Sequence, residues 1–292
     1  MATKQITTWT EFKTALTETI TENTTYEIMN DIDVSGEVLS SITATNNSFT
    51  KTFKPGVTLS SVSINGLTSY ATSTAFALFV IVASKNVTFT NIHFSNFMCQ
   101  NLWLFNTGEN ANTGAVFFNN CLFNGLCYGL YYGRSLTTIF NKCSVNIKCK
   151  YLSYRFPYFD DSYVIISPFS DNDTNSIVYA ANTIGGFGTN SYLGGTVRNN
   201  RSGLRIYSSY DLCHPRSNNC VFNLKAEYTD ATTSINVNNS DSGVSLVNNS
   251  YIKNSNNTNI TVTASGAIVP LTDTQLKSRT YIKENTNFPL YG

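Results

Sequence analysis

One short pattern recurs along the chain, and it limits the fold more than any other feature of the sequence. It is seen first at residues 86–96, which read NVTFTNIHFSN. Residues 116–124 (VFFNNCLFN) and 138–146 (TIFNKCSVN) repeat it, and residues 245–254 (SLVNNSYIKN) are a looser copy. The first copies begin roughly 20 to 30 residues apart, a spacing typical of the coils of a solenoid.

Within each copy the bulky residues alternate and then slip by one position. Val87 and Phe89 are two residues apart and share one face of a strand, and so do Ile92 and Phe94. The step from Phe89 to Ile92 is three residues. Both pairs therefore face the same interior only if the backbone bends between them.

Asparagine is concentrated at the predicted bends, which are residues 90–91, 119–120, 141–142 and 248–249. Asparagine tolerates left-handed backbone better than other non-glycine residues, so it suits a one- or two-residue corner. A single coil of strand, corner and strand cannot bury its apolar face, but stacked coils can. The sequence therefore predicts an all-β fold, a single-stranded parallel β-helix, which is right-handed by the general preference of parallel crossovers. The alternative is an antiparallel β-sandwich or jelly roll, which the repeated corner disfavours.

Both ends of the predicted β-helix carry signals for short capping helices. Residues 8–20 place four apolar side chains at helical spacing, and Thr8 with Glu11 forms a capping box. Those side chains are Trp9, Phe12, Leu16 and Ile20. We interpret residues 1–25 as an N-terminal cap, 26–270 as the β-helix and 271–292 as a C-terminal cap and tail. The alternative for the first helix is docking to a partner.

Three stretches resemble a known family: residues 8–16 (TWTEFKTAL), 26–36 (YEIMNDIDVSG) and 86–96. They resemble pectate-lyase-like β-helix proteins, most of all the non-enzymatic members carried by bacteriophages and gut bacteria. The likeness covers the first half of the chain well and the second half loosely. Its motifs are structural, so the resemblance implies the fold and, less directly, a fibre or spike of a phage particle.

Charge is scarce in this sequence. Charged residues make up 13% of the chain and the formal net charge is +1, which disfavours nucleic acid or an anionic membrane as a partner. The longest apolar run, residues 75–83, is too short to span a bilayer. The N-terminal residues lack the apolar core of a signal peptide, so we expect a protein assembled in the host cytoplasm.

Seven cysteines occur, and two of them occupy the same place in successive repeats. Cys121 and Cys143 stand where Ile92 stands in the first copy. A small buried residue that stacks on its neighbour explains this position, so we predict thiols in the core. A disulfide or a metal site is the alternative, although the cysteine spacings match no zinc motif. No metal, cofactor or catalytic residue is assigned.

Residues 151–175 break the rhythm of the repeat with an aromatic stretch, which we interpret as a loop excursion. Its candidate contacts to a glycan or to another subunit are Tyr154, Arg155, Phe156, Tyr158, Phe159, Asp160 and Asp161. Packing or subunit contact is the first interpretation and glycan binding the second. Asp160 and Asp161, with Asp171 and Asp173, are the local acidic cluster, and solvated turn residues explain such a cluster better than catalysis does.

These features together predict a non-catalytic structural virion protein of a bacteriophage, in a head or tail fibre, a spike or another surface attachment. The expected partners are other virion proteins and further copies of the chain, with a trimer as one plausible form, and a host-surface glycan. The alternative is a glycan-binding or polysaccharide-degrading β-helix adhesin. A bacterial surface adhesin is a third interpretation.

Overall fold

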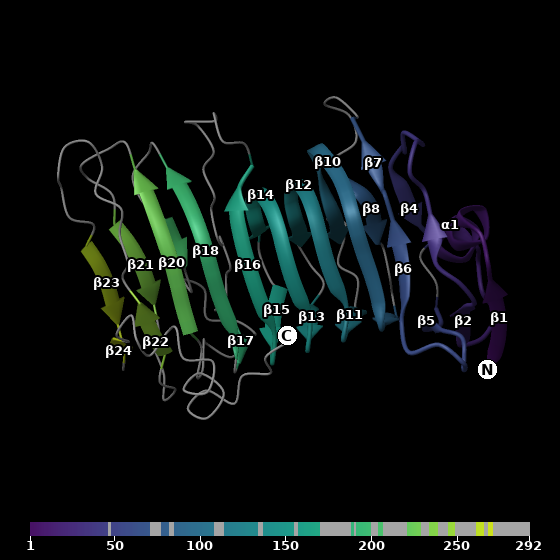
Figure 1. Ribbon diagram of the computed structural model, residues 1–292. Coiled ribbons are helices and arrows are strands. Elements are labelled where there is room, and N and C mark those ends of the chain that lie inside the picture. Colours follow the sequence, from purple (N-terminus) through teal and green to yellow (C-terminus); the bar gives the residue numbers. More distant parts are fainter. Residues whose placement is uncertain are drawn as a thin grey trace. The chain divides into compact units, whose positions relative to one another are not determined.

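The computed structural model describes residues 1–45, 48–70, 77–81, 85–107, 114–133, 137–154, 157–169, 188–189 and 191–199, and after residue 199 the backbone of short strands. The chain divides into two compact units, Met1–Cys143 and Ser144–Gly292. Throughout the described residues the strands pair in parallel and form a β-solenoid of about six turns (Figure 1). The predicted fold class is confirmed.

In the first unit, one sheet takes a strand from each coil. Its strands in order are β1 (Ala2–Ile6), β2 (Thr24–Ile28), β5 (Lys51–Pro55), β9 (Val87–Thr90), β11 (Ala115–Asn119) and β13 (Thr137–Asn141). Each strand pairs in register with the next, so equivalent residues of successive coils lie about 4.8 Å apart.

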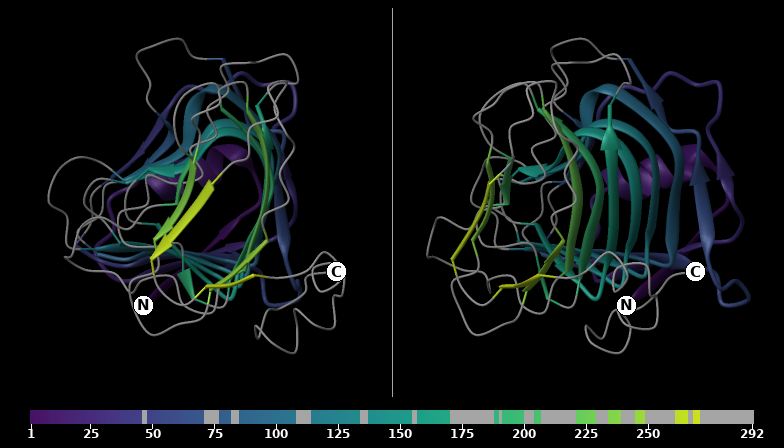
Figure 2. Two further views of the ribbon diagram at one scale, coloured as in Figure 1. Left: turned by 90° about the vertical axis from the view of Figure 1, so that its left-hand side faces the viewer. Right: turned by 60° about the vertical axis from the view of Figure 1, so that its left-hand side comes forward.

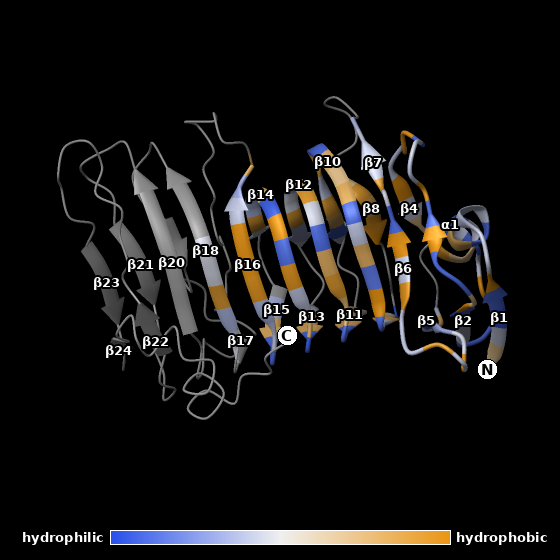
Figure 3. Cartoon of the chain, in the orientation of Figure 1, coloured by the Kyte–Doolittle hydropathy of each residue, from blue (hydrophilic) through white to orange (hydrophobic). Residues whose placement is uncertain are grey.

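The second sheet of this unit continues each coil beyond the corner. Its main strands are β3 (Ile32–Asp33), β6 (Val62–Asn65), β10 (Ile92–Thr107) and β12 (Leu122–Gly133). Three shorter strands extend it: β4 (Ile42–Ala44), β7 (Thr68–Ser69) and β8 (Ala77–Ile81). Hydrophobic and hydrophilic residues form bands along β10 and β12 (Figure 3), because neighbouring side chains point to opposite faces.

A column of stacked aromatic rings fills the interior along the first sheet. Its members in order are Tyr26, Phe53, Phe89, Phe118 and Phe140. Successive ring centroids are 4.9, 5.1, 5.2 and 4.8 Å apart, and the interplanar angles lie between 11° and 17°. The predicted stacking of Phe89, Phe118 and Phe140 is therefore confirmed.

The corners have the predicted left-handed backbone. Asn91, Asn120 and Lys142 all have φ of 53°. The Asn120 side-chain amide donates a hydrogen bond to Oδ1 of Asn91 at 2.7 Å, so the corner residues of adjacent coils are linked by their side chains. Asn96 has the same φ and marks a second corner, which the repeat did not predict.

The second corner forms its own ladder of side-chain hydrogen bonds. The Asn96 amide donates to Oδ1 of Asn65 at 2.7 Å, and the Asn65 amide donates to Oδ1 of Asp33 at 3.0 Å. Gly66 follows Asn65 with φ of 78°, and a Cβ there would lie 2.3 Å from Oγ of Ser35. Glycine is therefore required at this position both by backbone angle and by space.

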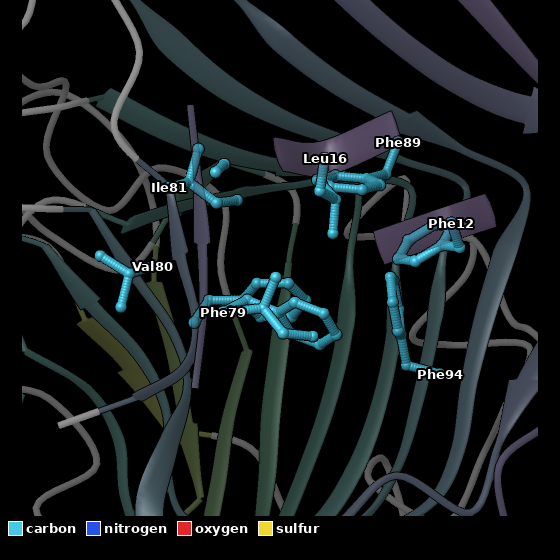
Figure 4. A pocket seen from close by; sticks show the side chains of 10 residues that line it. Phe12, Leu16, Phe79, Val80, Ile81, Phe89 and Phe94 are labelled. Carbon is cyan, nitrogen blue, oxygen red and sulfur yellow. The ribbon is translucent and has the colours of Figure 1, made fainter. Parts of the chain in front are cut away.

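The helix α1 (Trp9–Thr17) covers the end of the N-terminal coils, as expected for a cap (Figure 2). Thr8 and Glu11 form the predicted capping box. The helix ends at Thr17 and not at residue 20 as predicted, but all four apolar side chains are buried, including Ile20 beyond its end. The Phe12 ring lies 5.3 Å from the Phe53 ring. Phe12 and Leu16 point into the interior beside Phe79, Phe89 and Phe94 (Figure 4), where no room is left for a water molecule.

In the second unit the same parallel stacking continues. Its longest sheet runs through β14 (Ser144–Tyr154), β16 (Tyr163–Pro168), β18 (Tyr192–Asn199), β20 (Val221–Tyr228), β22 (Ser245–Asn248) and β24 (Ile268–Pro270). Two smaller groups are β15 (Pro157–Asp160) with β17 (Gly188–Thr189), and β19 (Leu204–Ile206) with β21 (Ser234–Asn238) and β23 (Thr261–Ser265). The predicted C-terminal cap at 271–292 lies outside the described residues.

The structure differs from the sequence-based expectation at residues 151–175. We predicted a loop excursion there, but residues 157–160 and 163–168 are the regular strands β15 and β16. The aromatic residues hid the alternation of a strand, because Tyr158 and Tyr163 occupy outward positions next to the buried Phe159 and Val164. Residues 170–175 lie outside the described part of the chain.

Candidate functional site

The predicted contact residues near position 158 are separated by the alternation of β15. Phe159 is 0% exposed and points into the interior, so its ring cannot meet a ligand at the surface. Tyr158 and Asp160, on either side of it, are partly exposed. Of this predicted group, Tyr158, Asp160 and the following Asp161 thus lie where a partner can reach them.

The structure describes three further residues of that group only in part or not at all. Tyr154 is the last residue of β14, and Arg155 and Phe156 lie outside the described residues. Asp171 and Asp173 of the acidic cluster lie outside them too. Of the acidic cluster that the sequence suggested, the described residues therefore contain Asp160 and Asp161.

Asp161 has a structural task at the corner between β15 and β16. Its φ is 45°, so it occupies the left-handed position that Asn91 and Asn120 occupy in the first unit. The next residue, Ser162, is buried, and its hydroxyl donates to the carbonyl oxygen of Asp160 at 2.8 Å. Aspartate tolerates this backbone nearly as well as asparagine does, which explains its presence without a catalytic role.

Three residues just inside the corners, Cys121, Cys143 and Ser191, each make a hydrogen bond to a main-chain carbonyl of the preceding coil. Sγ of Cys121 lies 3.5 Å from the carbonyl oxygen of Phe89, and Sγ of Cys143 lies 3.2 Å from that of Phe118. In the second unit, the Ser191 hydroxyl donates to the carbonyl oxygen of Phe159 at 3.1 Å. A small donor side chain suits this position, and a buried thiol serves as a weak donor there, whereas Ile92 fills the same position of the first copy by packing alone.

The prediction of core thiols is confirmed for the cysteines that the structure describes. These are Cys99, Cys121, Cys127, Cys143 and Cys149, all free and buried. Burial raises the pKa of the Cys99 thiol to about 12, so it stays protonated and unreactive. Cys213 and Cys220 lie outside the described residues. Within the described residues, no three His, Cys, Asp or Glu side chains are grouped so that they could hold a metal ion.

A second polar site lies at the N-terminal cap. A hollow of about 200 Å³ lies between β1, α1 and β2. The Lys4 ammonium donates to both carboxylate oxygens of Glu18, at 2.9 and 2.8 Å, and the Tyr26 hydroxyl donates to Oε1 of Glu18 at 2.6 Å. Lys4 Nζ also lies 6.0 Å from the centroid of the Tyr26 ring, at the end of the ring column. Lys4, Glu18 and Tyr26 are hydrogen-bonded to one another. Holding the cap helix against β1 and β2 therefore explains them better than ligand binding does.

Lys51 binds the C-terminal end of the same helix. It is 2% exposed, and its ammonium donates to the carbonyl oxygens of Ala15, Leu16 and Glu18, each at 2.8 Å. These carbonyls end the helix and have no partner within it, so the ammonium replaces the missing donors. Burial lowers the pKa of Lys51 to about 8, against the opposing effect of the Glu18 charge.

A third feature is the outward surface of the second sheet in the first unit. One row of side chains crosses neighbouring coils in register, because Val38 pairs with Thr68, Thr68 with Met98, and Met98 with Leu126. Two residues further along the chain lie Tyr70, Gln100 and Tyr128, where the pairing of β10 with β12 shifts register after Cys99. We call the seven side chains the neutral face: Val38, Thr68, Tyr70, Met98, Gln100, Leu126 and Tyr128.

Sequence reasoning missed both Lys51 and the neutral face. For the neutral face a signal was present, because residues 86–107 and 114–133 contain no Asp, Glu, Lys or Arg. For Lys51 there was none, since the lysine and the carbonyls it binds are more than thirty residues apart.

Comparisons with known proteins add no further identification. No protein-family model, no curated protein and no solved structure matches this chain. The β-helix fold that the sequence resemblance implies agrees with the observed solenoid. The family and the role that it implies remain a proposal. None of the described helices is long and apolar enough to cross a bilayer.

Proposed function

We propose that this chain is a non-catalytic structural protein of a bacteriophage particle, in a fibre, a spike or another surface attachment. The observation that supports this best is the continuous ring column from Tyr26 to Phe140, with a left-handed corner and a side-chain ladder beside it. The side chains of this interior pack each coil against the next.

Such an interior suits a load-bearing role. Successive coils pair in register along their strands, and the stability of such a stack is the sum of many similar contacts between coils. Protein interiors packed to this density are stiff, and stacked rings resist sliding because each ring fits between two others. A rigid spacer that holds a surface at a fixed distance is the function that this construction serves best.

The phage context is supported by the sequence resemblance. The stretches at residues 8–16, 26–36 and 86–96 resemble non-enzymatic β-helix proteins of phages. They now prove to be the cap helix, the first coil with its turn, and the first full repeat, which are the parts that a shared construction would preserve. The partners proposed are other virion proteins and further copies of the chain, and the location proposed is the virion.

Mass spectrometry of purified particles tests this proposal. Particles banded on a density gradient from a culture that carries the gene are expected to contain the chain in fixed ratio to the capsid protein. A particle preparation with a complete capsid and none of this chain would rule the proposal out. Comparison with the supernatant of the same gradient serves as the control for loosely adhering protein.

A second candidate function is glycan binding or cleavage at the corner after β15. Tyr158 and Asp160 are partly exposed there beside Asp161, and a ring next to carboxylates suits a sugar. A glycan array and a polysaccharide-degradation assay test it with Asp160→Ala and Asp161→Asn. The asparagine keeps the left-handed corner and removes only the charge. No binding and no cleavage by the unmodified protein would dispose of this candidate.

A further inference from the structure

The strand β1 has one paired edge and one free edge. It is the first strand of its sheet, and among the described strands it pairs only with β2. The main-chain N–H of Ala2 donates to the carbonyl oxygen of Asn23 at 3.0 Å. Alternate residues of a strand direct their main-chain groups to opposite edges, so Lys4 bonds to β2 as Ala2 does. The N–H and C=O groups of Thr3 and Gln5 therefore point away from β2, along the free edge.

This free edge lacks the devices that usually protect an exposed strand. Proteins block such edges with charged side chains, above all lysine, with proline or with bulges. The one charged side chain of β1 is that of Lys4, and both carboxylate oxygens of Glu18 bind its ammonium, at 2.9 and 2.8 Å. Thr3 and Gln5 are exposed and neutral, and β1 contains no proline and no shift of register. The edge is therefore open to pairing with a further strand.

The helix α1 limits what fits beside this edge. It covers the end of the first coil (Figure 2), where the interior of another coil would otherwise lie. A second solenoid therefore cannot stack on β1, whereas a single extended segment passes beside the helix. The hollow of about 200 Å³ borders Gln5 on the strand and Thr10 and Thr14 on the helix. It has room for a side chain of such a segment, because alternate side chains of a strand point to one face.

The walls of the hollow select the side chain that enters it. They carry the Lys4 ammonium and the carboxylates of Glu11 and Glu18. A charged side chain would be repelled by one of these groups, while an amide both donates and accepts hydrogen bonds. Since Lys4 and Glu18 already bind each other, most of the affinity for a segment comes from the main-chain groups of the edge.

We propose that the free edge of β1 binds an extended segment of another protein as an added strand, with a neutral polar side chain in the hollow. The unpaired main-chain groups of Thr3 and Gln5 are what a strand recognises, and a sugar or a folded surface does not match them. Only the identity of the donor, a neighbouring virion protein, rests on the proposed function. The binding site itself does not.

Nuclear magnetic resonance tests the site with the full chain and the acetylated, amidated peptide Thr-Val-Gln-Val-Thr, whose residues favour strands. In the free protein the amides of Thr3 and Gln5 should exchange with solvent faster than that of Lys4, and the peptide should slow them. Two control peptides carry N-methyl groups, one at both valines and the other at the glutamine. Because alternate N–H groups point to opposite edges, one control should bind and the other should not.

A matched pair of variants tests the edge from the side of the protein. Gln5→Pro removes an N–H that the added strand needs, and proline is tolerated in an edge strand where its nitrogen faces solvent. It should weaken binding of the peptide at least ~10-fold. Gln5→Ala keeps the N–H and should bind the peptide as the unmodified protein does. Circular dichroism confirms that both variants are folded.

Several results would overturn the inference. They are slow exchange of Thr3 and Gln5 in the free protein, no binding of the peptide, and equal binding of the two N-methylated peptides. Binding that Gln5→Pro leaves unchanged, or that Gln5→Ala also abolishes, would equally exclude main-chain pairing at this edge. None of these results removes the chain from purified particles, so failure here and failure of the proposed function are distinguishable.

Discussion

Removing one ring from the middle of the column tests whether stacked aromatics hold the coils together. Phe118 is 0% exposed and stacks on Phe89 at 5.2 Å and on Phe140 at 4.8 Å. It also contacts the rings of Phe105 at 4.9 Å and Phe123 at 5.3 Å. Phe118→Ala would therefore open a cavity bordered by these four rings.

The expected cost follows from this surrounding. A buried Phe→Ala change costs about 3–5 kcal/mol, and the cost is greater where the site cannot collapse. Here the neighbouring rings are held by strands in register on both sides, and each lost ring pair was worth ~0.5–1.5 kcal/mol beyond its buried area. We expect a loss in the upper half of the range, about 4–5 kcal/mol, and about 1.5 kcal/mol for Phe118→Leu, which keeps most of the volume.

Urea unfolding followed by far-ultraviolet circular dichroism measures these costs. Phe49→Ala is the matched control, because Phe49 is 37% exposed and its truncation should change the free energy of unfolding by only about 0.5 kcal/mol. If Phe118→Ala proved no more destabilising than Phe49→Ala, the column would contribute nothing to stability and the reasoning would be refuted.

Three further changes test the corner and the cap. Asn120→Ala should cost about 2–3 kcal/mol in urea unfolding, from the left-handed backbone and the lost ladder bond, whereas Asn120→Gly should cost about 1 kcal/mol. Equal costs would show that the backbone angle is unimportant there. Lys51→Met should destabilise the protein by about 2 kcal/mol, because the carbonyl oxygens of Ala15 and Glu18 lose this donor and that of Leu16 keeps the Thr45 N–H at 3.3 Å. Unchanged hydrogen exchange in α1 would contradict that role. Burial raises the pKa of Glu18, but hydrogen bonds from Lys4 and Tyr26 and the nearby ammonium charges lower it, so that overall the pKa lies below its ordinary 4.5. The stability that the ionised Glu18 contributes is therefore complete above pH 4.5 and is lost as the pH falls further. Glu18→Gln should therefore flatten the fall in thermal stability below pH 4.5, and an unchanged acid limb would exclude Glu18 as its source.

The part of the fold that the sequence predicted is the part that depends on near neighbours. The three-residue step from Phe89 to Ile92 can be read without knowing the partner strand, and so can the asparagine that bends it. Because the coils are parallel and in register, the same local rule then places Phe118 over Phe89. The capping box of Thr8 and Glu11 was predictable for the same reason.

What the sequence did not predict depends on contacts between distant residues or on a changed residue type. Asp161 forms a corner like that of Asn91, whereas the sequence led us to expect a solvated turn residue within a loop excursion. Phe159 looked like an exposed ring until the strand around it placed it inside. Lys51 reaches the end of α1 only because the coils are stacked, and no local pattern marks it.

Cross-linking across adjacent coils tests the register of the stack most directly. Thr88, Phe117 and Ile139 point outward from β9, β11 and β13, and each is paired in register with the next. In-register neighbours about 4.8 Å apart fall within the range of Cα distances that a disulfide spans, while residues two coils apart do not. After mild oxidation, mass spectrometry should find a disulfide in the Thr88→Cys/Phe117→Cys double variant and none in Thr88→Cys/Ile139→Cys. Efficient linkage in the second variant, or its absence in the first, would contradict a column of stacked coils.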